Sequence, residues 1–199
     1  MNLKRVMNRM NRAALLAAAL LIAAGTANAQ KSKAGNAMKP VADKSFFTKA
    51  AEGGMAEVEF GQLAAKKASN PAVKQFGQKM VDDHSKANDE LKSLAQAQGV
   101  TLPKSIGTKN KAELAKLERL NGAVFDRTYM SDMVKDHKED VSEFKYESTR
   151  GRNTEAKSFA GKTLPTLEEH LKMAMDTQKQ LYARSGSTGK AGKSVGGKK

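Results

Sequence analysis

The 199-residue sequence contains no cysteine, and this absence removes several classes of site at once. Without a thiol the chain has no disulfide, no acyl-modified lipoprotein cysteine and no cysteine nucleophile. The sequence also lacks a serine elbow and a glycine-rich phosphate loop, which are signatures of nucleophilic and nucleotide chemistry. Stability therefore has to come from packing alone, and no motif predicts a catalytic residue.

Long apolar runs are also scarce. Residues 13–24 form an apolar run that is too short to span a bilayer, and no later segment is apolar enough to do so. Four basic residues precede this run, and the small-x-small pattern Ala27-Asn28-Ala29 follows it. These features predict a secretory signal peptide over residues 1–29, with cleavage near Ala29-Gln30. The mature protein is expected to be periplasmic or secreted, without a transmembrane segment.

Acidic residues are too few to balance the basic ones, mainly because of the flanking segments. Removing residues 1–29 lowers the formal net charge from +14 to +10, since this segment has four basic residues and no acid. Seven further lysines lie in residues 30–43 and 185–199, which lack apolar periodicity. We expect a disordered linker over residues 30–43 and a disordered basic tail over residues 184–199. The tail can contact anionic envelope polymers or a protein partner, and no specific nucleic-acid partner is expected.

Alternation typical of strands is nowhere sustained, whereas apolar residues recur at helical spacing. The pattern predicts long helices over about residues 45–68, 71–98, 123–149 and 154–183. Asp43 or Ser45 can cap the first helix, and Asn70-Pro71 supplies a cap followed by proline at the first helical position. Residues 100–122 contain Pro103 and Gly107, which predicts a long connection with one small helix.

Two short connections therefore flank one long connection. This arrangement predicts that the second and third long helices run parallel, because the long segment can return along the whole length of the bundle. The predicted fold is an all-α, ferritin-like four-helix bundle over residues 44–183, with a short extra helix in the crossover.

The three histidines of the chain lie near the middle of three different predicted helices. They are His84, His137 and His170, and Glu57 lies near the middle of the remaining long helix. Midpoints of equal helices share one level in a bundle, so these four side chains can converge. A carboxylate and three imidazoles suit zinc, copper, iron or manganese. The alternative is a layer of core histidines that form hydrogen bonds and bind no metal.

Residues one helical turn from the histidines suggest further ligands. Met80 lies four residues before His84, and Met133 lies four before His137, so each thioether shares a helical face with an imidazole. Sulfur with imidazole favours copper, particularly Cu(I), unless both methionines only fill the core. Asp140 is placed to orient His137. The acids directly before each histidine are expected to be solvated or to pair across helices.

Di-iron ferritins carry a glutamate three residues before a histidine on two helices. The corresponding positions here hold Val81, Val134 and Leu167. An oxidase or iron-storage centre is therefore not expected, which leaves a single-metal site or no site.

Several motifs taken together resemble a known bacterial family. They are Phe46-Phe47, residues 56–59, 80–88, 125–129 and 133–137, and the Leu164-Pro165 to His170-Leu171 segment. Over about residues 43–183 they resemble an exported family of unknown function whose members are often labelled outer membrane proteins. The resemblance implies a ferritin-like helical bundle and no established activity, substrate or cofactor.

Two functions of different class remain open. The first is an exported bundle that binds a single transition metal through His84, His137 and His170, with Glu57 as an acid ligand and Met80 or Met133 as soft ligands. The second is a non-catalytic cell-envelope protein whose basic tail contacts anionic polymers or a partner. Inward-facing histidines would also allow the bundle to sense pH.

Overall fold

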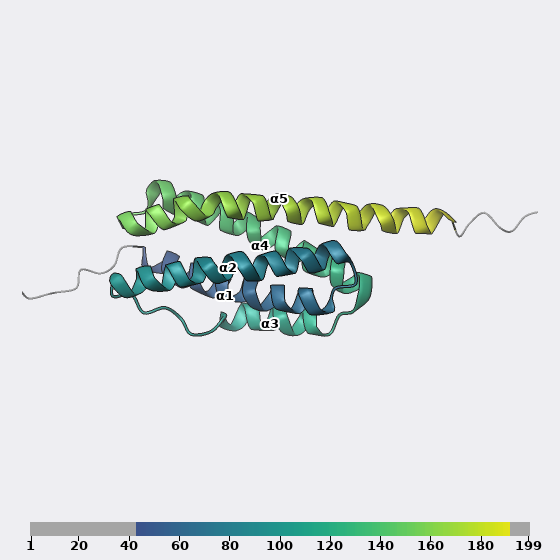
Figure 1. Ribbon diagram of the computed structural model, residues 1–199, viewed down its shortest axis with the longest axis horizontal. Coiled ribbons are helices and arrows are strands. Elements are labelled where there is room, and N and C mark those ends of the chain that lie inside the picture. Colours follow the sequence, from purple (N-terminus) through teal and green to yellow (C-terminus); the bar gives the residue numbers. More distant parts are fainter. Residues whose placement is uncertain (1–42, 192–199) are drawn as a thin grey trace, which may run out of the picture. The chain divides into compact units, whose positions relative to one another are not determined.

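A computed structural model describes residues 43–191, and the side chains of residues 43–183. The predicted signal peptide, residues 30–42 of the predicted linker and residues 192–199 of the predicted tail lie outside the described residues. The described part has no strand, which confirms the all-α class. Its helices are α1 (Lys44–Lys67), α2 (Pro71–Ala97), α3 (Gly107–Glu118), α4 (Gly122–Arg150) and α5 (Thr154–Ala191) (Figure 1). Among them, no helix combines the length and hydropathy that crossing a membrane requires.

Local signals account for most helix boundaries. Asn70 Oδ1 accepts a hydrogen bond from the backbone N–H of Ala72 at 2.8 Å, and Pro71 follows it at the first helical position, as predicted. Asp43 occupies the N-cap position of α1, as the sequence predicts, but its side chain forms no capping hydrogen bond with this helix. α5 continues through Ala191, beyond the end predicted near Ala183.

The helices form two antiparallel hairpins, α1 with α2 and α4 with α5, and carboxylates join these hairpins at both ends. Near the start of α4, Asp126 accepts hydrogen bonds from the backbone N–H groups of Ser69 and Asn70 at 3.0 and 2.9 Å. At the opposite end, Asp43 accepts from the backbone N–H groups of residues 152 and 153 at 2.6 and 2.7 Å. α2 and α4 thus begin at one end and run parallel, which confirms the predicted crossover.

The short helix of the crossover, α3, packs against α1 and α4 (Figure 1). Leu117 anchors it, with a side chain that is fully buried in the core. α3 therefore covers one side of the bundle beside α1 and α4.

Two apolar clusters fill the bundle. One includes Val73 and Phe125, near the starts of α2 and α4, and the other includes Phe46 and Phe159, near the starts of α1 and α5. The clusters therefore lie toward opposite ends of the bundle. The three histidines lie near the middle of their helices, so polar side chains interrupt an otherwise apolar core.

α1 and α2 approach each other closely at two glycines. A Cβ atom added to Gly77 would lie 2.8 Å from the Ala64 Cβ and 2.8 Å from the Gly61 backbone oxygen. A Cβ atom on Gly61 would lie 2.6 Å from the Gly77 oxygen. These contacts involve backbone and Cβ atoms, which cannot rotate away, so a side chain at either position would force the two helices apart.

We expect Gly77→Ala to lower the free energy of unfolding by about 2 kcal/mol, because overpacking at a rigid contact outweighs the gain in helix propensity. Gly53→Ala is the matched control, since a Cβ atom there meets nothing within 4 Å. That control should stabilise the protein by up to about 1 kcal/mol. Chemical denaturation of both variants and the parent measures the difference, and equal stability of the two variants would contradict the close-approach argument.

Candidate metal centre

The structure brings the three predicted histidines together in one buried layer. His84 from α2, His137 from α4 and His170 from α5 are 7%, 0% and 0% exposed. Their ring centroids are separated by 5.8 Å for His84 and His137, 5.3 Å for His84 and His170, and 5.4 Å for His137 and His170. One ring nitrogen of each residue lies within 4.8 Å of the corresponding nitrogens of the other two.

Each of these imidazoles has one buried nitrogen without a hydrogen-bond partner. These atoms are His84 Nε2, His137 Nε2 and His170 Nδ1. His137 Nδ1 lies 3.0 Å from the Met133 carbonyl oxygen, and a carbonyl can only accept, so Nδ1 carries the proton. The Nε2 atom of His137 is then left with a free lone pair.

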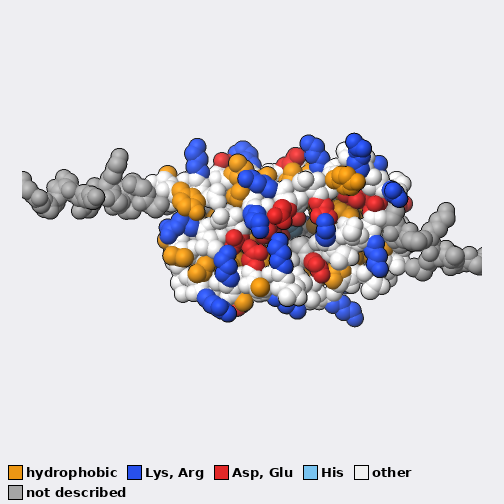
Figure 2. All heavy atoms as spheres, turned by 180° about the vertical axis from the view of Figure 1, so that it is seen from behind, with side chains coloured by type: hydrophobic (Ala, Val, Ile, Leu, Met, Phe, Trp, Pro, Cys, Tyr) orange, Lys and Arg blue, Asp and Glu red, His pale blue; other side chains and the backbone are white. Residues whose placement is uncertain are grey.

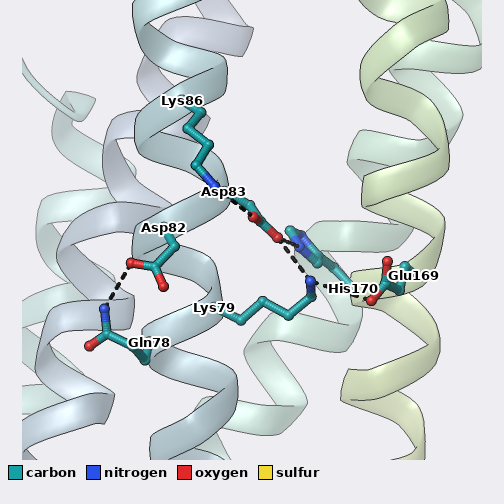
Figure 3. A network of polar contacts seen from close by, with 7 residues as sticks. All are labelled: Gln78, Lys79, Asp82, Asp83, Lys86, Glu169 and His170. Carbon is teal, nitrogen blue, oxygen red and sulfur yellow. Dashed lines mark hydrogen bonds and ion pairs between the residues drawn. The ribbon is translucent and has the colours of Figure 1, made fainter.

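His170 is oriented from the neighbouring helix α2. Its Nε2 lies 2.9 Å from Asp83 Oδ2 and donates a hydrogen bond to this carboxylate, which leaves Nδ1 unprotonated. Asp83 also interacts with Lys79 at 3.1 Å and with Lys86 at 3.9 Å (Figure 3). Lys79 reaches Glu169 of α5 at 3.3 Å, so the network joins two helices. This confirms cross-helix pairing for Asp83, although the sequence did not identify His170 as the partner.

Burial and the neighbouring groups keep the side chains of this layer in the protonation states that a metal site requires. Burial lowers the pKa of all three imidazoles, and the neighbouring imidazoles also lower those of His84 and His137; together these effects bring the pKa of His137 to about 3. Burial acts to raise the pKa of Asp83, but hydrogen bonds from His170 and Lys79 outweigh it and lower this pKa. At neutral pH the rings are therefore neutral and Asp83 is ionised, as in carboxylate–histidine–metal arrangements.

Glu57 is close to the layer but faces a different part of it. Its Oε1 lies 3.7 Å from His137 Nδ1, which is the nitrogen that donates to the Met133 carbonyl. Glu57 forms a second group with His137 and Asp140, whose ligand atoms lie within 4.8 Å of one another. The structure thus brings Glu57 to the predicted level, but beside Asp140 and not among the three imidazoles. The Met133 carbonyl, and not Asp140, hydrogen-bonds His137.

Met80 and Met133 are both fully buried, and both belong to the apolar cluster that includes Phe76 and Tyr129. Phe76 also packs edge-on against the His137 ring, with centroids 6.3 Å apart. This placement favours the alternative in which the methionine side chains fill the core. What Met133 supplies to the site is its backbone carbonyl.

Fold and site together define an all-helical bundle with a buried layer of three imidazoles. The chain belongs to the family described as a domain of unknown function, DUF4142, which matches residues 27–177. This agrees with the resemblance to a family without an established activity.

Two solved structures are similar to this chain. One is CopM in the Cu(I)-bound form, with 18% identity, a TM-score of 0.60, and coverage of 72% of this chain and 99% of that chain. The other is CopM in the Cu(II)-bound form, with 17% identity, a TM-score of 0.57, and coverage of 71% and 99%. At this level of identity the likeness shows a shared helical fold. Comparison with curated proteins gave no match.

Proposed function

We propose that this protein binds one copper ion through His84 Nε2, His137 Nε2 and His170 Nδ1. The observation that carries the proposal is that these nitrogens are buried, lack hydrogen-bond partners and come from three neighbouring rings. An unpaired polar atom in a core costs free energy. A bound cation would satisfy all three lone pairs together.

The donor set favours copper or zinc over harder metals. Imidazole nitrogen suits both, whereas magnesium and calcium prefer oxygen ligands and manganese prefers carboxylates. The group of three histidines contains no carboxylate, and the sequence has no cysteine to complete a thiolate site. The similarity to CopM in copper-bound forms supports copper. The chain's own residues would hold the ion, with Asp83 and the Met133 carbonyl fixing two of the rings.

Metal titration tests this proposal. Full-length mature protein should retain one equivalent of copper in competition with a Cu(I) chelator, and each of His84→Ala, His137→Ala and His170→Ala should lose this binding. Met80→Leu and Met133→Leu are controls, because these side chains lie in the apolar cluster. Melting curves establish that each variant is folded. If a variant with all three histidine substitutions binds copper as tightly as the parent, the proposed site is refuted. If the parent binds zinc more tightly than copper, the choice of metal is refuted.

A further inference from the structure

An acidic pocket of about 350 Å³ opens between α1, the start of α3 and α4. On the face drawn in Figure 2, acidic side chains gather near the middle with basic side chains around them. The acids that line the pocket are Glu52, Glu57, Asp136, Glu139, Asp140 and Glu143, and the basic residues are Lys49 and Lys109.

The two lysines are already engaged by acids of the pocket. Lys49 Nζ lies 3.3 Å from Glu143 Oε1, and Lys109 Nζ lies 3.9 Å from Glu139 Oε2. All four of these side chains are at least partly exposed. Within residues 43–183, no lysine or arginine lies within salt-bridge distance of Glu57, Asp136 or Asp140. The charge of Lys109 offsets those of Asp136 and Asp140 only in part, so the carboxyl groups in the deeper part of the pocket lack a basic partner of their own.

Glu57 is the buried residue among the acids that line the pocket. Its side chain is 3% exposed, and its Oε2 atom has no hydrogen-bond partner. A carboxylate oxygen in this position loses its hydration without gaining a protein partner, which is costly. Asp140 lines the same pocket, and one of its oxygens lies within 4.8 Å of a Glu57 oxygen. The carboxyl groups of Glu57 and Asp140 are thus close enough for one cation to bind an oxygen atom of each.

The pKa values of both carboxyl groups agree with this picture. Burial raises the pKa of Glu57, and the charges of Asp140 and Asp136 raise it further. Burial and the charge of Asp136 also raise the pKa of Asp140, to about 7. Each group is therefore less stable as an anion because the other acids surround it, and a nearby positive charge would relieve this repulsion.

We infer that Glu57 and Asp140 hold a divalent cation at the inner end of this pocket, at a site separate from the three imidazoles. Carboxylate and water oxygens favour magnesium, calcium or manganese over copper, so the two sites differ in ligand chemistry. The hydrogen bond of His137 Nδ1 to the Met133 carbonyl keeps this nitrogen out of the oxygen site. The pocket itself has room for the waters that complete the coordination of such a cation.

Manganese is the probe, because free Mn²⁺ gives an electron paramagnetic resonance signal that protein binding diminishes. The full-length mature protein should bind one Mn²⁺. Glu57→Gln and Asp140→Asn should each weaken this binding at least about tenfold. Removing a residue that only hydrogen-bonds a metal ligand already weakens metal affinity by about this factor, and a direct ligand should matter at least as much. These variants keep the side-chain shape, and Asp140 is the less buried of the two residues, so Asp140→Asn keeps the test valid if Glu57→Gln does not fold.

Glu139→Gln and Glu143→Gln are the matched controls, because these acids line the pocket but are paired with lysines. They should change Mn²⁺ affinity little. His84→Ala should leave it unchanged, because His84 belongs only to the histidine group. Copper titration of the same samples keeps the two sites distinguishable. The inference is overturned if the parent retains no Mn²⁺, if Glu57→Gln and Asp140→Asn bind it like the parent, or if His84→Ala abolishes binding.

Discussion

Glu147→Gln is expected to stabilise the protein by about 3 kcal/mol at pH 8 and to leave its stability unchanged near pH 4. Glu147 lies in the last turns of α4, is 4% exposed, and has an Oε1 atom without a hydrogen-bond partner. A buried carboxylate near the C-terminus of a helix is doubly unfavourable, because it lacks hydration and faces the negative end of the helix dipole.

The neighbours of Glu147 make its protonated form the stable one. Burial, the charge of Asp43, a hydrogen bond with Asp43 and the charge of Glu143 together raise the pKa of Glu147 to about 7. Lys157 opposes this effect only in part. Asp43 meanwhile accepts hydrogen bonds from the backbone N–H groups of residues 152 and 153. Glu147 thus acts as a neutral donor beside a carboxylate that joins α1 to the start of α5.

The sign of the pH dependence follows from linkage. The reference pKa of this carboxyl group is 4.5, and that in the folded protein is about 7. Between these values the folded state binds a proton that the unfolded state releases, so stability falls as pH rises through this window. The penalty is complete above pH 7 and amounts to about 3 kcal/mol at about 1.4 kcal/mol per pKa unit. Glutamine keeps a donor toward Asp43 and cannot ionise, so it removes the penalty.

Urea denaturation of the parent and Glu147→Gln at pH 4.5, 6 and 8 measures this difference. Other buried acids also titrate in the parent, but they are common to both proteins and cancel in the comparison. Glu139→Gln is the matched control, since Glu139 lies two turns away on α4, is exposed and pairs with Lys109. A stability difference between parent and Glu147→Gln that does not change with pH would show that the carboxyl group titrates normally.

The sequence was sufficient to predict the elements and their order, because the signals for these are local. Apolar periodicity, the Asn70-Pro71 pair and the length of the crossover each depend on residues close in the chain. They led to four long helices, a short one in the crossover, and parallel α2 and α4. The common level of His84, His137 and His170 was also predictable, because midpoints of helices of similar length coincide.

The rotation of each helix about its own axis was not predictable in the same way. Glu57 reaches the expected level, but its rotation on α1 directs it to the Nδ1 edge of His137 and to Asp140. Likewise, Asp83 is about 100° around α2 from its neighbour His84, so it meets His170 on α5. The residue that Asp83 contacts depends on how α2 and α5 pack against each other. The sequence alone contains no local pattern that specifies this packing. Hydrogen bonds between residues far apart in the chain, such as those from residues 152 and 153 to Asp43, could not be predicted from the sequence for the same reason.

Asp83→Ala is expected to weaken copper binding about 10- to 100-fold, the usual consequence of removing the partner that orients a metal-ligating histidine. This expectation rests on the proposed copper site. Asp83 does not reach the unpartnered nitrogens, but it accepts the proton of His170 Nε2 and so keeps the lone pair on Nδ1. Without the carboxylate, the His170 ring can take the other tautomer or rotate, and part of the population then lacks the third donor.

Asp82→Ala is the matched control, because Asp82 precedes Asp83 on α2 but accepts a hydrogen bond from Gln78 at 2.9 Å, away from His170 (Figure 3). Copper affinity should then change only in Asp83→Ala, while both variants remain folded. Nitrogen-15 chemical shifts of the His170 ring report which ring nitrogen carries the proton. A loss of packing alone would not change this tautomer. The parent should show a protonated Nε2, and Asp83→Ala should show a mixture of tautomers. If Asp83→Ala binds copper as tightly as the parent with the same tautomer, the packing of α5 alone orients His170, and Asp83 has no positioning role.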